Sequence, residues 1–207
     1  MTYPNPYIHQ PQPLMMVISG PSGVGKDTIA RKLIEHFPDS FYFVVTATTR
    51  NPRPGEINGR DYFFVSSQEF ARMIEENELL EYAVVYNDFK GVPKQQIRDA
   101  LASGRDVIMR VDVQGAATIR KLVPHAIFIF LMAESEEAMI KRLRERKSET
   151  DEGLHLRIAT ARQELKRIRE FDYRVINADS AQHTTVDQIL CIMEAERCRV
   201  NRPPVVL

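Results

Sequence analysis

The sequence predicts an α/β fold: a P-loop core with a parallel sheet flanked by helices, an inserted β-rich lobe and a short lid. Three observations support this prediction. Short apolar runs alternate with segments of helical spacing along most of the 207 residues, which is the pattern of a parallel sheet covered by helices. A glycine-rich motif joins the first apolar run to the first helical segment. Between residues 46 and 91 the alternation is interrupted by several strands with little helix between them.

The elements follow in chain order. Residues 14–18 are expected to form a buried strand, and a helix follows from Ile29. Further strands are expected at residues 41–46, 61–65, 80–86, 106–112, 125–132 and 172–176. Further helices are expected at residues 68–77, 94–103, 115–121, 136–146, 154–171 and 185–199, with Ser67 and Ser135 as N-caps. The strands at 106–112 and 125–132 are rich in Val, Ile and Phe, as in the centre of a parallel sheet.

The length suits one domain with inserted parts. We expect this domain at residues 14–200, with the inserted lobe at about 46–91 and the lid at about 144–155. The lid contains the charge run RERKSETD, which is either a solvated linker or a mobile segment that excludes water. Residues 1–13 are polar and proline-rich and are expected to be a flexible extension. Residues 201–207 form a C-terminal tail.

The composition narrows the function classes. Lys+Arg and Asp+Glu both number 28, so the formal net charge is zero and a generally basic nucleic-acid surface is not supported. No apolar run is long enough to span a bilayer, and the N-terminal extension lacks the pattern of a secretory signal. The only cysteines, Cys191 and Cys198, predict free thiols and a cytoplasmic location. A monomer or small homo-oligomer without nucleic-acid or membrane partners is expected.

The glycine-rich motif is the most informative stretch of the chain. It reads Gly20-x-x-x-x-Gly25-Lys26 and lies between a strand and a helix, as a Walker A loop must. Glycines let consecutive backbone N–H groups face one anion, and the helix N-terminus favours negative charge. Lys26 adds a point charge for the β- and γ-phosphates of ATP. The expected ATP-binding residues of this segment are Gly20, Pro21, Ser22, Gly23, Val24, Gly25, Lys26, Asp27 and Thr28.

One position of this loop departs from the motif. The residue after the lysine is usually Ser or Thr, but here it is Asp27. Since Mg²⁺ accepts carboxylate oxygens and keeps several waters, Asp27 could hold the ion directly or through water. The alternative is that Asp27 only caps the helix and leaves the metal alone.

A second segment has the chemistry of a phosphate site. Arg50 and Arg53 flank Pro52 in a loop that Pro54 also stiffens, and Tyr62 follows. Two guanidinium groups held in a rigid turn offer forked donors that suit a phosphate. Further along the chain, Asp112 ends an apolar strand, where an acid that orients Mg²⁺-bound water and Lys26 is expected.

Together these segments resemble the guanylate kinase family. The resemblance rests on GPSGVGK, TTRNPRPGEINGRDYFFV, NELLEYA, VDVQG and the RLxxR pattern, which runs from Arg142 to Arg146. It extends from about residue 16 to residue 180. It implies MgATP-dependent phosphorylation of GMP to GDP, and of dGMP, in purine nucleotide metabolism. It also implies that the inserted lobe binds the nucleoside monophosphate.

The resemblance implies a role for each matching residue. Arg50, Arg53 and Tyr62 would hold the GMP phosphate, and Lys90 could replace a phosphate-binding tyrosine as a cation. Gly91 and Asp112 would also belong to the GMP site, where Asp112 could lie near the guanine. Glu81 and Thr46 would hold the guanine, whose N1–H and N2–H suit a carboxylate and whose O6 suits a hydroxyl. Such polar groups reject the wrong base strongly. The catalytic set would be Lys26, Asp112, Arg146 and Arg157, and Asn177 would lie beside the adenine.

Three further positions depart from the family pattern. Lys90 stands where the family often has a tyrosine that binds phosphate, and Val92 stands where it has a hydroxyl. Arg110 stands where an acid is frequent. Two other functions stay open at this point: a non-catalytic guanylate-kinase-like domain that binds phosphorylated partners, and a P-loop kinase of another phosphorylated acceptor. The complete Walker A loop favours the enzyme over the binding domain.

Overall fold

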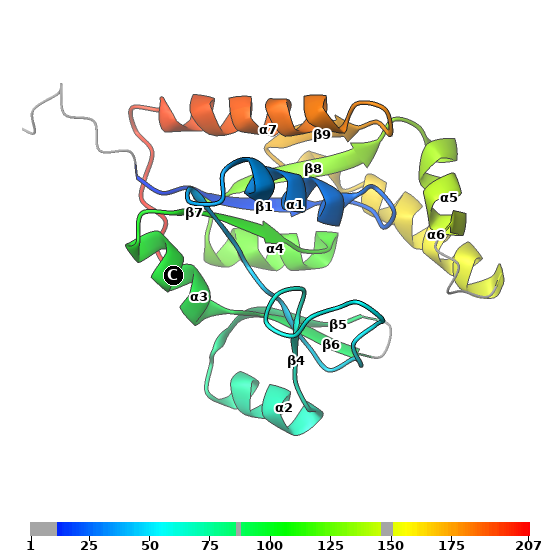
Figure 1. Cartoon of the computed structure of the whole chain (residues 1–207), viewed down its shortest axis with the longest axis horizontal. Helices are drawn as coiled ribbons and strands as arrows, with labels where there is room; N and C mark the ends of the chain where they lie inside the picture. Colours follow the sequence, from blue (N-terminus) through cyan, green and yellow to red (C-terminus); the bar gives the residue numbers. More distant parts are fainter. Residues whose placement is uncertain (1–11, 86–87, 146–150) are drawn as a thin grey trace, which may run out of the picture.

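The computed structural model describes residues 12–85, 88–145 and 151–207. Its core is a sheet of five parallel strands in the order β2-β7-β1-β8-β9 (Figure 1). These strands are β1 (Met15–Ser19), β2 (Phe41–Phe43), β7 (Asp106–Arg110), β8 (Ile127–Ala133) and β9 (Tyr173–Asn177). The connection after β1 leads toward β2, whereas the connection after its neighbour β8 leads the opposite way, to β9. The carboxyl ends of β1 and β8 therefore flank a topological switch point, where ligands bind in sheets of this kind.

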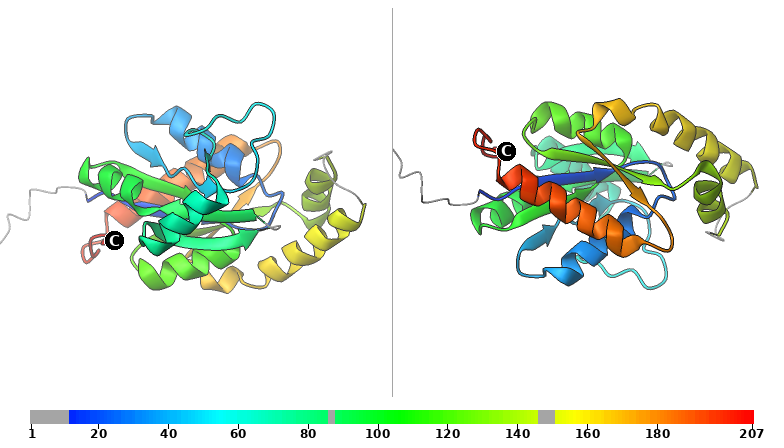
Figure 2. Two further views of the ribbon diagram at one scale, coloured as in Figure 1. Left: turned by 90° about the horizontal axis from the view of Figure 1, so that it is seen from below. Right: turned by 90° about the horizontal axis from the view of Figure 1, so that it is seen from above.

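Helices cover both faces of this sheet. Alternate side chains of a strand point to opposite faces, so Met16 and Ile18 pack with α1 (Lys26–His36) and α7 (Gln182–Arg197). Met15 and Val17 pack with α3 (Lys94–Ala102) and α4 (Val113–Leu122) on the other face. The perpendicular views show the same layering (Figure 2). The predicted fold class is confirmed.

A second, smaller sheet lies beside the carboxyl ends of the core strands. Its order is β4-β3-β6-β5, with mostly antiparallel pairing. The strands are β3 (Ala47–Thr48), β4 (Phe63–Phe64), β5 (Leu79–Val85) and β6 (Asp88–Pro93), and α2 (Ser67–Glu75) packs on them. Phe70 and Met73 of α2 form a separate small core with Ala47 and Leu79. The lobe therefore has its own hydrophobic support.

Three local predictions were wrong. The helix expected at residues 154–171 ends at Leu165, and a separate 3₁₀ turn follows at Ile168–Glu170. The apolar run at 41–46 was expected to be one strand, but β2 ends at Phe43 and the chain crosses to the second sheet, where β3 starts at Ala47. A run of apolar residues does not reveal such a change of sheet, because both sheets bury it. The N-cap of α2 is Ser66 rather than Ser67, since the Ser66 hydroxyl accepts a hydrogen bond from the Glu69 N–H at 3.0 Å.

The remaining helical segments lie between β8 and β9 in the sequence. They are α5 (Glu136–Glu145), α6 (Asp151–Leu165) and the 3₁₀ turn η1 (Ile168–Glu170). In Figure 1, α5 and α6 project away from the sheet at its carboxyl end. None of the described helices combines the length and apolar character needed to cross a bilayer.

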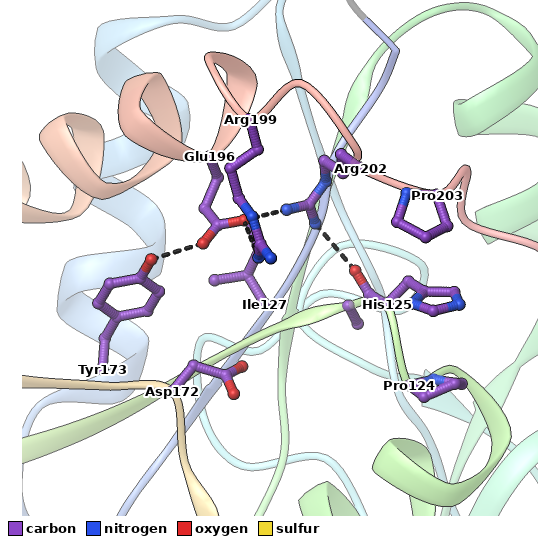
Figure 3. Close-up of a pocket in the computed structure, with 10 residues that line it drawn as sticks. Pro124, His125, Ile127, Asp172, Tyr173, Glu196, Arg199, Arg202 and Pro203 are labelled. Atoms are coloured by element: carbon purple, nitrogen blue, oxygen red, sulfur yellow. Dashed lines mark hydrogen bonds and ion pairs between the residues drawn. The ribbon is translucent and has the colours of Figure 1, made fainter.

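The C-terminal tail is anchored at the amino end of the sheet (Figure 3). Arg202 forms an ion pair with Glu196 and donates to the His125 carbonyl oxygen at 2.9 Å. The Tyr173 hydroxyl donates to the same Glu196 carboxylate at 2.5 Å. Beyond this anchor, the side chains at 205 and 207 pack against the core under α3 and α4. These contacts border a surface pocket of about 450 Å³.

Candidate active site

The Walker A loop follows β1 directly and has the backbone that its glycines predict. Gly20 and Gly25 have φ values of 137° and 88°, which L side chains rarely adopt. A Cβ on Gly20 would lie 2.1 Å from the Leu131 carbonyl oxygen, and one on Gly25 would lie 2.4 Å from Nδ2 of Asn177. The loop therefore packs so closely on β8 and β9 that only glycine fits at these two positions.

Asn177 supports the loop from the end of β9. Its side-chain N–H donates to the Val24 carbonyl at 2.8 Å, and its amide oxygen accepts from the Thr185 hydroxyl at 3.3 Å. The residue is 3% exposed. Its side chain is thus engaged with the loop and α7, and its place beside the adenine stays a prediction.

Lys26 starts α1 and extends over its own loop. Its ammonium donates to the carbonyl oxygens of Gly20 and Pro21 at 2.5 and 2.9 Å. Burial lowers the pKa of Lys26 to about 8, although the charges of Glu164, Asp27 and Asp112 oppose that effect. A cation surrounded by loop backbone and by carboxylates is placed to meet an anion that binds at the loop.

Glu164 of α6 is a site residue that sequence reasoning missed. Burial raises the pKa of its carboxyl, while the charge of Lys26 and a hydrogen bond from the Ser22 N–H oppose that rise. Its position in a long polar helix gives no sequence signal for this role, because the contact depends on how α6 returns toward the loop.

Arg50 of the inserted lobe is held by a carboxylate. Both terminal nitrogens of Arg50 donate to Glu56, at 2.6 and 2.7 Å, and the Arg53 backbone N–H donates to the same carboxylate at 2.7 Å. These hydrogen bonds keep the pKa of Glu56 below its ordinary value. The Arg50 guanidinium carbon also lies 4.7 Å from the centroid of the Tyr62 ring. Arg50, Arg53 and Tyr62 are therefore brought together, as predicted, and Glu56 is the partner that the sequence did not identify.

Lys90 completes this cationic group from β6. Burial lowers its pKa, and the charges of Arg110, Arg50 and Arg53 lower it further. The neighbouring Gly91 packs closely, since a Cβ there would lie 2.8 Å from a methyl group of Leu79. Val92 is 1% exposed and belongs to the core, so it presents no group to a ligand.

The predicted guanine residues lie at the edge between lobe and core. Glu81 and Thr46 are each 9% exposed. A Cβ on Gly115 would lie 3.1 Å from a Glu81 carboxylate oxygen, so the glycine leaves room for this carboxylate against α4. Burial, and secondarily the Asp112 charge, raises the pKa of Glu81 to about 7.

Asp112 and Asp27 have defined partners. Asp112 is the N-cap of α4, and its carboxylate accepts the Gly115 N–H at 2.8 Å. Asp27 lies in the first turn of α1, whose N-cap is Gly25 rather than Asp27. The Asp27 carboxylate forms an ion pair with Arg110. The carboxylate that the sequence offered to Mg²⁺ therefore has a cationic partner in this structure.

The lid arginines are only partly described. Arg146 lies outside the described residues, and Arg157 is half-buried in α6. Arg142 of α5 donates to the Asn177 carbonyl oxygen at 2.9 Å and pairs with Glu134 and Asp179. Its Nε and Nη1 are buried and have no hydrogen-bond partner among the described residues. Arg142 thus brings two further buried donors to the carboxyl end of β9, whereas the sequence identified it only as part of a motif.

Comparison with known proteins agrees with this geometry. A family model described as guanylate kinase matches residues 12–196. Guanylate kinase 2, chloroplastic/mitochondrial, from Oryza sativa subsp. japonica is 53% identical over 97% of this chain and 70% of its own length. The guanylate kinase of Clostridium tetani is 41% identical over 91% of this chain and 89% of its own length.

A solved structure gives the same result in three dimensions. The guanylate kinase from Anaplasma phagocytophilum superposes with a TM-score of 0.74 at 29% identity, covering 93% of this chain and 90% of that one. A Walker A loop, a cationic acceptor cluster and a buried carboxylate lie together at the carboxyl end of the sheet. With these matches over nearly the whole chain, the protein belongs to the guanylate kinase family.

Proposed function

We propose that this chain transfers the γ-phosphoryl group of ATP to GMP and, with the same site, to dGMP, as a step of purine nucleotide metabolism. One observation supports this proposal above the others. The Lys26 loop, the Arg50–Tyr62 cluster and the Glu81 carboxylate all lie at the same end of the sheet. The groups assigned to the acceptor meet its base and its phosphate. GMP and dGMP have the same base and the same phosphate, so these groups do not discriminate between them.

Base recognition falls to Glu81 and Thr46. An ionised Glu81 accepts the N1–H and N2–H of guanine, and the Thr46 hydroxyl donates to O6. Adenine has no N1–H at that position and would leave the buried carboxylate unpaired, which is costly. The selectivity for guanine over adenine thus comes from the penalty imposed on the wrong base.

Phosphate recognition falls to Arg50, Arg53, Tyr62 and Lys90. They hold the acceptor phosphate, which would otherwise repel the triphosphate. The attacking oxygen of this phosphate is already ionised near neutral pH, so the reaction needs no general base. Catalysis then consists of in-line positioning and charge neutralisation, with Lys26, Arg146 and Arg157 assigned to the transferring group.

The residues fit a magnesium ion that arrives with the nucleotide. Among the residues that the structure describes, no group of three or more metal-ligating side chains is present, which suits Mg²⁺ because it binds through phosphates, waters and one or two carboxylates. When bound, the ion neutralises charge on the β- and γ-phosphates. Asp112 is assigned to its water shell, since one carboxylate oxygen accepts the Gly115 N–H and the other is left for such a role.

A coupled assay of ADP release tests the function directly. GMP, dGMP, AMP, CMP and UMP are offered in turn with ATP and Mg²⁺, and the first two are expected to be the substrates. Turnover of a different monophosphate would identify a P-loop kinase with another acceptor. Binding of nucleotides without any turnover would favour the non-catalytic domain, which the retained Lys26 loop argues against.

Location and assembly remain predictions of this proposal. Cys191 and Cys198 are free and exposed, which fits the reducing cytoplasm predicted from the sequence. The reducing interior of an organelle, as named for the rice relative, would suit them equally. A fluorescent fusion and size-exclusion chromatography with light scattering would determine the location and the oligomeric state.

A further inference from the structure

Two departures from the family pattern meet in space. Arg110 is the last residue of β7, and Asp27 lies in the first turn of α1. They are 83 positions apart in the sequence, yet their side chains form an ion pair. The Arg110 side chain is 15% exposed, whereas that of Asp27 is 52% exposed. The two unusual residues therefore act as one unit in which the arginine is the buried member.

Arg110 also reaches the acceptor cluster. Its guanidinium carbon lies 5.2 Å from the Tyr62 ring centroid, and that of Arg50 lies 4.7 Å from the same centroid. The charges of Arg110, Arg50 and Arg53 all act on Lys90. Cations gathered this closely repel one another, and a bound phosphate would remove the repulsion.

The arginine has donors to spare. A guanidinium carries five N–H donors in a rigid fork, and a single carboxylate uses at most two of them at once. Arg110 belongs to the core sheet, whereas Arg50, Arg53, Tyr62 and Lys90 all belong to the inserted lobe. It stands beside the first turn of the helix that the donor loop begins. Arg110 therefore lies between the first turn of α1 and the cationic cluster of the inserted lobe.

We propose that Arg110 is a further ligand of the acceptor phosphate and that Asp27 is the residue that positions it. This inference rests on the proposed function, because it concerns the same acceptor site. It assigns the Asp27 carboxylate to Arg110 instead of to Mg²⁺. It also makes the acceptor phosphate the point at which the core and the inserted lobe are joined.

Titration calorimetry with GMP, in the absence of ATP and Mg²⁺, tests the first part. Arg110→Ala is expected to weaken GMP binding at least tenfold, since it removes charge-assisted hydrogen bonds, and to leave ATP binding within twofold. Arg110→Lys keeps the charge but loses the fork, so an intermediate loss is expected. If a thermal melt shows that the alanine variant is not folded at the assay temperature, the lysine variant is used for the test instead.

Arg105→Ala is the matched control. Arg105 precedes the opposite end of β7 and lies 5.0 Å from the Tyr42 ring centroid, so it has the same kind of aromatic contact away from the site. GMP binding by this variant should stay within twofold of wild type. Unchanged GMP binding by both Arg110 variants, or a loss confined to ATP, would overturn the proposal.

A double-mutant cycle tests the second part. Asp27→Asn should weaken GMP binding several-fold in the wild-type background and less than twofold in the Arg110→Ala background, because its effect passes through the arginine. The same shift in the free Mg²⁺ requirement in both backgrounds, with GMP binding unaffected, would return Asp27 to the metal. Wild-type turnover of GMP is measured alongside, so a failed function is distinguished from a failed role for Arg110.

Discussion

The side-chain amide of Asn177 and the carbonyl of Val24 are hydrogen-bonded at 2.8 Å across 153 positions of sequence. This bond joins the end of the last core strand to the loop after the first. The bond is buried, and the Asn177 amide leaves no room for a side chain at Gly25. The shape of the phosphate-binding loop thus depends on a residue from the other end of the chain.

Asn177→Ala is expected to weaken ATP binding about tenfold and to lower the free energy of unfolding by about 1–3 kcal/mol, because it leaves a buried carbonyl without its donor. GMP binding should change little, since the acceptor cluster does not contact Asn177. Calorimetry with each nucleotide and chemical denaturation measure the three quantities. Equal losses for ATP and GMP would mean that the bond supports the fold as a whole rather than the loop.

Lys26→Ala should keep the fold and reduce turnover by several orders of magnitude, because it removes a major charge from the β- and γ-phosphates. Arg31→Ala is the control, since Arg31 is an exposed cation of the same helix. Steady-state rates with GMP and a thermal melt check the prediction. A folded Lys26→Ala protein with nearly normal kcat would refute the assignment of the loop.

Arg50→Ala should raise the KM for GMP at least tenfold and leave ATP binding unchanged, because Arg50 belongs to the inserted lobe. Arg60→Ala is its control: this nearby arginine pairs with Asp61, and its side chain is 63% exposed. Initial rates at varied GMP, together with calorimetry for ATP, decide the outcome. Should ATP affinity fall while GMP affinity holds, the two nucleotide sites have been assigned in reverse.

The affinity for GMP should depend on pH through Glu81. In the proposed site the ionised Glu81 carboxylate accepts the N1–H and N2–H of guanine, and burial raises the pKa of this group to about 7. Binding should therefore be strong above pH 7 and weaken progressively as the pH falls below it. The measurement is Kd for GMP between pH 5.5 and 8.5. Glu81→Gln should bind GMP weakly at every pH, and a wild-type affinity that is level across this range would contradict the role.

The same residue should lower the stability of the enzyme at high pH. A carboxyl whose pKa is raised on folding binds more protons in the folded state, so stability falls as the pH rises from about 4.5 to 7. Glu81→Gln removes this loss and should gain on the order of 1–3 kcal/mol in free energy of unfolding at pH 8. Urea denaturation of both proteins at pH 5 and pH 8 measures it. A gain that is equal at both pH values would not come from ionisation.

The sequence predicted those parts of the site that depend on local backbone. Walker A glycines specify their own loop conformation, and the spacing of Arg50 and Arg53 around Pro52 specifies a rigid turn. The alternation of apolar runs and helical segments predicted the sheet and its helices for the same reason, because local sequence determines where each strand and helix forms.

The parts that the sequence did not reveal depend on tertiary contacts. Glu56 and Glu164 are ordinary charged residues of a loop and a helix until folding brings them to Arg50 and Lys26. Asp27 and Arg110 each stood out as a departure from the family, but their pairing requires β7 to lie beside β1. Individual unusual residues can therefore be recognised in the sequence, whereas the residues that they contact become known only once the order of the strands in the sheet is known.

The anchored C-terminal tail is expected to affect the stability of this enzyme but not its catalytic activity. Arg202 and the packed side chains at 205 and 207 close the amino end of the sheet, while the residues assigned to the two nucleotides lie at the carboxyl end. A chain clipped after Arg197 would keep every residue assigned to catalysis and lose this closure. Freshly purified, it should phosphorylate GMP at the rate of the full chain. It should, however, be inactivated faster by heat and be digested faster by proteases.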